Sequence, residues 1–136
     1  METTVHYLGG TKFEVGTGSH RVLCDQPVAN GGEDADMSPP AFLLASLGTC
    51  AAFYALQYLR TRALPAEGLS VKVHAEKALQ PARLASFRIE VDIPQELDDR
   101  HKEGVLRAVK ACLIHNTLLQ PPAIQTVIET GVHAHV

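Results

Sequence analysis

The 136-residue sequence predicts an α+β fold, in which two helices pack on a largely antiparallel sheet within a single domain spanning residues 1–136. Three observations predict this class: two stretches with apolar residues at helical spacing, two segments of strict apolar–polar alternation, and a hairpin pattern near the N-terminus. Strict alternation means that one face of a strand is buried and the other is polar. This favours antiparallel pairing over a parallel sheet covered on both faces.

The first predicted element is a β-hairpin whose turn lies at residues 16–19. A polar loop follows at residues 25–37, because its Asp, Asn, Gly and Pro residues interrupt the alternation. The alternating apolar positions of the hairpin are Phe13, Val15, Val22 and Cys24. We interpret Cys24 as a strand residue.

A long helix is predicted to begin at Ser38, a suitable N-cap, because prolines are tolerated in a first helical turn. Pro65 and Gly68 end it. Its apolar stripe, at spacings of three and four residues, consists of Leu43, Leu47, Cys50 and Tyr54.

The stretch 41–59 of this helix contains no charged residue over 19 positions, which meets the length criterion for a membrane span. It is rich in alanine and carries Ser46, Thr49 and Gln57, and no basic residues flank it upstream. We therefore expect no membrane insertion. A helix that is apolar all round also suits the centre of a globule or of a dimer interface.

Two strands follow, in which Val71, Val73 and Ala75 and then Phe87, Ile89 and Val91 alternate with polar residues. A second helix is predicted from Asp98–Asp99 to Pro121–Pro122, with Val105, Val109 and Cys112 on one face. A last strand is predicted at residues 124–136.

Composition excludes several functional classes. The net charge is −3 with no basic run, so we expect no nucleic-acid partner. With three cysteines and no recognisable signal peptide, the expected location is the reducing cytoplasm. His133 and His135 share a strand face, but we expect no metal site, and no cofactor-binding motif is present.

Cys50 and Cys112 are distant in sequence, yet both lie on apolar helix faces and can meet in a core. Two such thiols can form a redox pair, in which one attacks an oxidant and the other resolves the product. Spacing alone favours simple packing, because free cysteine is among the most buried residue types. His115, three residues after Cys112, is a candidate to tune its thiol.

The segments DQP with a following Gly-Gly loop, SPPAFLLASLGTC and ACLIHNTL resemble the OsmC/Ohr family of osmotically inducible and organic hydroperoxide resistance proteins, in a divergent branch. The resemblance covers nearly the whole chain. It implies an intertwined homodimer with two active sites at the subunit interface. It also implies a thiol peroxidase without a cofactor, with Cys50 as the attacking cysteine and Cys112 as the resolving one.

In this interpretation the substrate is an organic hydroperoxide, held in an apolar pocket by Phe42, Phe53 and Tyr54, and an external dithiol reduces the disulfide. Arg21 is the candidate that holds Cys50 as a thiolate, with Glu33, Asp34 or Asp36 to orient it.

Three positions depart from the family pattern: Pro40–Ala41 stand where a glutamate is usual, the loop 25–37 lacks an arginine, and Leu113 replaces a proline. Two alternatives therefore stay open: a protein that binds a small apolar ligand, and a thiol redox sensor without peroxidase turnover.

Overall fold

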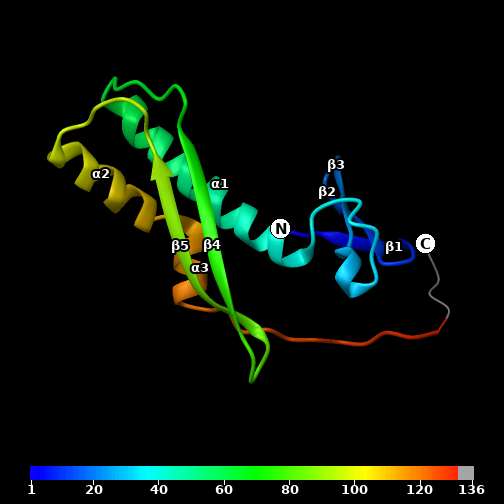
Figure 1. Ribbon diagram of the computed structural model, residues 1–136. Coiled ribbons are helices and arrows are strands. Elements are labelled where there is room, and N and C mark those ends of the chain that lie inside the picture. Colours follow the sequence, from blue (N-terminus) through cyan, green and yellow to red (C-terminus); the bar gives the residue numbers. More distant parts are fainter. Residues whose placement is uncertain (132–136) are drawn as a thin grey trace.

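The computed structural model describes residues 1–131, which form two antiparallel sheets and three α-helices (Figure 1). The N-terminal sheet consists of β1 (Thr4–Gly9), β2 (Lys12–Thr17) and β3 (His20–Cys24). The second sheet consists of β4 (Ser70–Ala78) and β5 (Arg83–Asp92). The helices are α1 (Pro39–Thr61), α2 (Asp99–Lys110) and α3 (Leu113–Leu119), with a short 3-10 turn, η1, at Val28–Asn30. The predicted α+β class is confirmed.

The N-terminal sheet contains the predicted hairpin, because β2 and β3 pair antiparallel with Thr17 opposite His20. It also contains β1, which the sequence analysis did not predict. The register places apolar residues of all three strands on one face, and this face is largely open to solvent. Its members are Val5, Tyr7, Phe13, Val15, Val22 and Cys24.

The loop that joins this sheet to α1 is organised around the carboxylate of Asp25, which is only 1% exposed. Its Oδ1 accepts hydrogen bonds from the Thr11 hydroxyl and the Gln26 N–H, and its Oδ2 accepts from the N–H groups of Glu33 and Ala35. Burying the charge of the Asp25 carboxylate without these four donors would cost free energy. The loop therefore folds around this carboxylate and supplies its hydrogen bonds.

Helix α1 begins at Pro39 after the N-cap Ser38, as predicted, and ends at Thr61. By length and composition alone it could cross a membrane. Only one stripe of this helix is fully buried, with members four residues apart, so the predicted stripe is only partly right. The buried residues are Leu47, Ala51, Ala55 and Leu59.

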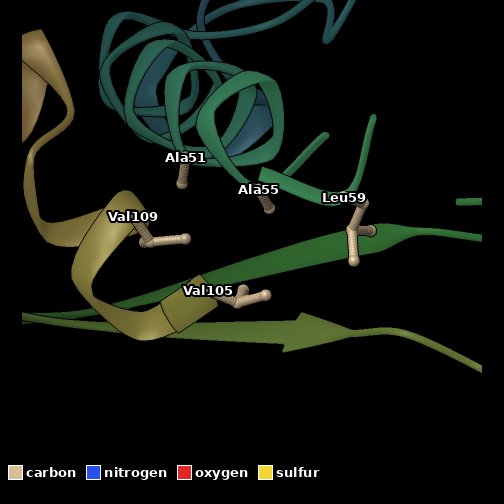
Figure 2. Packing of buried hydrophobic residues seen from close by; sticks show 5 residues of the cluster. All are labelled: Ala51, Ala55, Leu59, Val105 and Val109. Atoms are coloured by element: carbon tan, nitrogen blue, oxygen red, sulfur yellow. The ribbon is translucent and has the colours of Figure 1, made fainter. Parts of the chain in front are cut away.

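The core lies where α1 crosses α2 above the β4–β5 hairpin (Figure 2). Ala51 and Ala55 allow close approach of α2, whose Val105 and Val109 fill the space between the helices. Gly104 of α2 lets the two helices approach more closely still, because the site has no room for a side chain. A Cβ there would lie 2.0 Å from the Tyr58 hydroxyl. The strands complete the core with Val71, Ile89 and Val91.

Two predictions for the C-terminal half are wrong. The second helix is interrupted: α2 ends at Lys110, Cys112 has an extended ψ of 136°, and α3 starts at Leu113. The predicted strand is absent from residues 124–131, where the described backbone has no β-pairing. A strand needs an edge to pair with, and this segment runs away from β5 (Figure 1). His133 and His135 lie outside the described residues.

Candidate thiol site

Helix α1 carries Cys50 in its middle, eleven residues after Pro39 and thus about 16 Å along the helix axis. At that distance the partial positive charge of the helix N-terminus has little effect on the thiol. Cys50 is half-buried, so it stays accessible to a small reactant.

Cys112 reaches Cys50 because the chain breaks between α2 and α3. It is the N-cap residue of α3 and is fully buried. The two side chains lie next to each other, close enough for Cys50 to raise the pKa of the Cys112 thiol, and both thiols are free. The structure therefore brings the two predicted cysteines together, from elements 62 positions apart in the sequence.

The surroundings of Cys112 keep it protonated. Burial raises the pKa of its thiol, and the neighbouring Cys50 raises it further, since two adjacent thiolates would repel each other. The N–H groups of His115 and Ile114 oppose this by favouring the thiolate, although no capping hydrogen bond forms. The net shift of the pKa is upward.

Aromatic side chains lie next to the thiol pair on α1. Tyr54, one turn after Cys50, lines a shallow hollow of about 400 Å³, whose other lining residues are Ala111, Leu113, Asn116, Thr117 and Gln120. Phe53 packs edge-on against Tyr54, with ring centroids 5.9 Å apart, and is 53% exposed. Phe42 is half-buried two turns before Cys50 on the same helix.

Arg21 lies on β3, and its polar contacts within the described chain are all in its own hairpin. Its Nη1 donates to the carbonyl oxygens of Gly18 and His20, each at 2.8 Å, and its Nε is 3.7 Å from Glu14. Glu33, a candidate to orient it, instead pairs with Lys12. Within one chain the structure therefore does not bring Arg21 to the thiol pair.

The family model for OsmC-like protein matches residues 31–127, which include both cysteines. The chain belongs to the OsmC-like family. The recognition made from the three sequence segments is thus confirmed.

Solved structures share the OsmC-like fold with this chain. A Psychrobacter arcticus 273-4 protein named for osmotic stress and detoxification response is 23% identical, with a TM-score of 0.79 over 85% of each chain. An OsmC-like protein of Mycoplasma pneumoniae is 19% identical, with a TM-score of 0.74 over 88% of this chain and 87% of its own. An organic hydroperoxide resistance protein of Legionella pneumophila is 18% identical, with a TM-score of 0.60 over 86% and 87%. The search of curated proteins finds no match.

Sequence reasoning on this OsmC-like chain missed two features of the site region. One is the helix break that turns Cys112 toward Cys50, for which the sequence carries no proline or glycine as a signal. The other is Asp25, whose DQP and Gly-Gly context did mark a loop but not a buried carboxylate. Among residues 1–131, no cluster of three or more His, Cys, Asp or Glu side chains is arranged to hold a metal.

Proposed function

We propose that this OsmC-like protein is a thiol-dependent peroxidase that reduces organic hydroperoxides. The observation that carries the proposal is the contact between Cys50 and Cys112, from two helical segments that meet only in the folded chain. Family membership supports a role in redox or stress chemistry. The name of the Legionella pneumophila protein, organic hydroperoxide resistance protein, supports the class of substrate.

The proposed cycle has three steps. The Cys50 thiolate attacks the distal oxygen of the hydroperoxide, the O–O bond breaks, and the alcohol leaves after protonation, so that Cys50 becomes a sulfenic acid. The Cys112 thiol then displaces the hydroxyl group as water and forms the Cys50–Cys112 disulfide. An external dithiol reduces this disulfide by exchange and is itself oxidised.

The surroundings of the two thiols support these separate roles. Cys50 is half-buried and accessible, whereas Cys112 is fully buried and its raised pKa keeps it a neutral thiol. A neutral thiol is a poor nucleophile toward peroxide, so Cys112 does not compete for the substrate. It lies in contact with the sulfur that it has to resolve.

The apolar surroundings support a hydroperoxide with an apolar organic group as substrate. Tyr54, Ala111 and Leu113 form the apolar part of the hollow beside the thiols, and Phe53 packs against Tyr54. The polar part of the lining consists of Asn116, Thr117 and Gln120. The apolar part gains free energy by burying a hydrocarbon group, which hydrogen peroxide lacks. Phe42, Phe53 and Tyr54 remain the proposed substrate contacts.

The active unit that we propose is a homodimer in the cytoplasm. The chain exposes 10508 Å², whereas a compact monomer of 14.7 kDa exposes roughly 6,900 Å². The excess supports a large interface between two copies, which would also cover the apolar surface of α1. In such a dimer, Arg21 of one subunit can approach Cys50 of the other and stabilise its thiolate.

The test is the consumption of cumene hydroperoxide with dithiothreitol as reductant, followed at catalytic protein concentration. We expect turnover by the wild type and none by Cys50→Ser, because the attacking sulfur is gone. Cys24→Ser is the matched control, since Cys24 is also a buried thiol but lies in the N-terminal sheet, and it should retain activity. Cys112→Ser should accumulate a sulfenic acid that dimedone traps.

Two other outcomes would identify the competing functions. Oxidation of one equivalent without turnover would indicate a thiol sensor. Thiols that survive excess peroxide would reject the peroxidase and favour the binding of an apolar ligand. The observation that keeps this last alternative open is that the polar contacts of Arg21 within one chain lie in its own hairpin.

A further inference from the structure

His115 lies on the inner side of α3, close to the thiol pair. This helix packs against α1, the helix that carries Cys50. His115 is half-buried, whereas the two residues that follow it, Asn116 and Thr117, are exposed. The imidazole therefore belongs to the part of α3 that faces the protein, although no step of the proposed cycle uses it.

The start of α3 places this imidazole beside Cys112. Cys112 is the N-cap residue, so His115 is the third residue of the helix. A side chain at the third position reaches back toward the N-cap residue, which is the arrangement of a capping box. The backbone N–H of His115 is also near enough to the Cys112 sulfur to favour its thiolate. Both the backbone and the side chain of His115 thus lie next to the resolving thiol.

The Nδ1 atom of His115 is buried and has no hydrogen-bond partner within the described chain. A buried N–H without an acceptor costs free energy, so the neutral imidazole carries its proton on Nε2 instead. Nδ1 then presents a free lone pair that can accept a proton. Buried polar atoms are seldom left unpaired, and a catalytic role is one of the reasons for an exception.

The resolving step of the proposed cycle needs such a proton acceptor. Cys112 is fully buried, and burial, followed by the neighbouring Cys50, raises the pKa of its thiol. Its thiolate is therefore scarce near neutral pH. Cys112 nevertheless has to lose its proton when it attacks the Cys50 sulfenic acid, and the departing hydroxide has to gain one. One group that accepts the first proton and returns it to the hydroxide meets both requirements.

The elements around the thiol pair offer few other groups for this transfer. Positions 41–59 of α1 contain no charged residue, and His115 is the only ionisable side chain in the sequence of α3. Tyr54 lines the neighbouring hollow, but a neutral phenol is a weak proton acceptor. Lys110, at the end of α2, is exposed and lines the groove between α2 and β5 instead.

We infer that His115 is a catalytic residue of the resolving step, in which it relays the proton of the Cys112 thiol to the hydroxide that leaves Cys50. Nδ1 takes the proton from Cys112, whose sulfur forms the S–S bond while the S–O bond of the Cys50 sulfenic acid breaks. The electron pair of the S–O bond leaves with the hydroxide, which receives the proton from Nδ1–H and departs as water. The imidazole returns to its neutral form, and no further reactant is consumed.

The inference rests on the proposed peroxidase function and concerns only its second step. In the resting chain Nδ1 makes no hydrogen bond to the Cys112 thiol. Catalytic hydrogen bonds often tighten only in the reacting state, so the relay forms when Cys112 turns its proton toward the imidazole.

The test follows a single turnover, in which reduced protein is mixed rapidly with one equivalent of cumene hydroperoxide. Dimedone labelling reports the Cys50 sulfenic acid, and peptide mass mapping reports the Cys50–Cys112 disulfide. We expect His115→Gln to form the sulfenic acid within about twofold of the wild-type rate, and the disulfide about 100-fold more slowly. The variant should therefore accumulate a sulfenic acid that the wild type resolves.

Two further measurements separate proton transfer from a role in packing. Without the relay the Cys112 thiolate itself has to form, so disulfide formation in His115→Gln should become about tenfold faster per pH unit below the raised pKa of this thiol. The wild-type rate should depend less steeply on pH. His115→Ala leaves room for a small base, so added imidazole should restore its rate of disulfide formation but not that of His115→Gln.

His101→Gln is the matched control for these variants. His101 is also a half-buried histidine, but it lies in the first turn of α2 and its Nδ1 is 3.1 Å from the Tyr58 hydroxyl. This variant should resolve the sulfenic acid at the wild-type rate.

The possible results distinguish the inference from the function on which it rests. Disulfide formation by His115→Gln at the wild-type rate would overturn the inference and leave the peroxidase intact. Equal slowing of both steps, or a slow His115→Ala that imidazole does not rescue, would assign His115 a packing role and overturn the inference as well. A wild type that forms no sulfenic acid would overturn the proposed function, and the inference with it.

Discussion

The helical layer (residues 39–119) and the N-terminal sheet (residues 4–24) use apolar residues in opposite ways. In the helical layer, Ala51, Ala55 and Leu59 of α1 are completely buried against α2 and the strands. In the N-terminal sheet, Val5 is 55% exposed and Tyr7 65%, although their alternation gives the sheet an apolar face. One region thus buries its apolar surface within the chain, whereas the other leaves an apolar surface exposed.

This difference fits the proposed homodimer, in which each chain would form half of the active unit. The helical layer brings the two thiols together without help, since Cys50 and Cys112 both belong to it. Arg21, the cation proposed to activate Cys50, belongs to the other region, and its polar contacts among residues 1–131 lie in its own hairpin. The thiol pair is therefore complete in one chain, whereas the proposed active site is not.

The largest expected effect is on peroxidase activity. Mixtures of two variants test whether Arg21 and Cys50 of one active site come from different subunits. Arg21→Gln should lower peroxidase activity by about 100-fold by removing the charge that stabilises the thiolate, and Cys50→Ser should abolish it. If Arg21 acts on the partner's Cys50, refolding the two variants together restores one intact site in each mixed dimer. The equimolar mixture should then regain about a quarter of the wild-type rate, because half of its dimers are mixed.

The control for mixing is a pair of variants that damage the same region, Cys50→Ser with Cys112→Ser. Both cysteines come from one chain, so each mixed dimer contains no complete thiol pair and activity should stay low. A mixture of Arg21→Gln and Cys50→Ser that is no more active than its parts would show that Arg21 does not act across subunits.

The next effect sharpens the contrast in packing. Gly104→Ala should destabilise the fold by about 1–3 kcal/mol, because the new methyl group overlaps the Tyr58 ring, which Arg62 stacks on at 3.7 Å. In an exposed helix the same change would stabilise the fold by about 1 kcal/mol. A loss of stability would therefore confirm that Gly104 is in close contact with Tyr58, and a gain would contradict it. Urea unfolding measures the change in stability. Shortening the side chain in Tyr58→Leu should cancel the cost, and Val22→Ile on the open sheet face should have little effect.

The sequence predicted the helical layer better than its surroundings, for physical reasons. The start of α1 depends only on neighbouring residues, the N-cap Ser38 and the two prolines that follow it. The alternation in β4 and β5 reflects the burial of one face of each strand. The contact of Cys50 with Cys112 followed from the family resemblance, since spacing alone cannot pair residues on different helices. The break at Cys112 has no local signal, so a continuous helix was the natural expectation.

The errors near the two ends of the chain have a common origin. The alternation of Val5 and Tyr7 in β1 went unrecognised, and the same kind of alternation at Ile124 and Ile128 was interpreted as a strand that the single chain does not form. A strand forms only when another strand is available to pair with it. The periodicity of the sequence does not reveal whether such a partner strand exists within the same chain.

A smaller effect concerns Asp25, which ties the loop between the two regions to Thr11. The hydrogen bond from the Thr11 hydroxyl, then that from the Ala35 N–H, lowers the pKa of this carboxyl from 3.8 to about 2. A lowered pKa means that the stabilisation is fully present above pH 3.8 and is lost as the pH falls through that value toward 2. Asp25→Asn should lower the melting temperature by several degrees at neutral pH, with the difference from wild type shrinking below pH 4. A difference that is constant with pH would mean that the charge of Asp25 does not hold the loop.

The smallest effect compares one buried thiol from each region. Burial raises the pKa of both Cys24 and Cys112, and then Asp25 raises that of Cys24, whereas Cys50 raises that of Cys112. A raised thiol pKa delays thiolate formation to higher pH, so iodoacetamide should modify both sites slowly near neutrality and faster as the pH rises. Cys50→Ala removes the neighbouring sulfur and should move the pH profile of Cys112 labelling downward, measured site by site by mass spectrometry. Cys24 is the internal control and should keep its profile, because its pKa is raised by burial and by Asp25 and not by Cys50. An unchanged Cys112 profile would show that the two thiols do not interact, and would remove the contact on which the proposed disulfide depends.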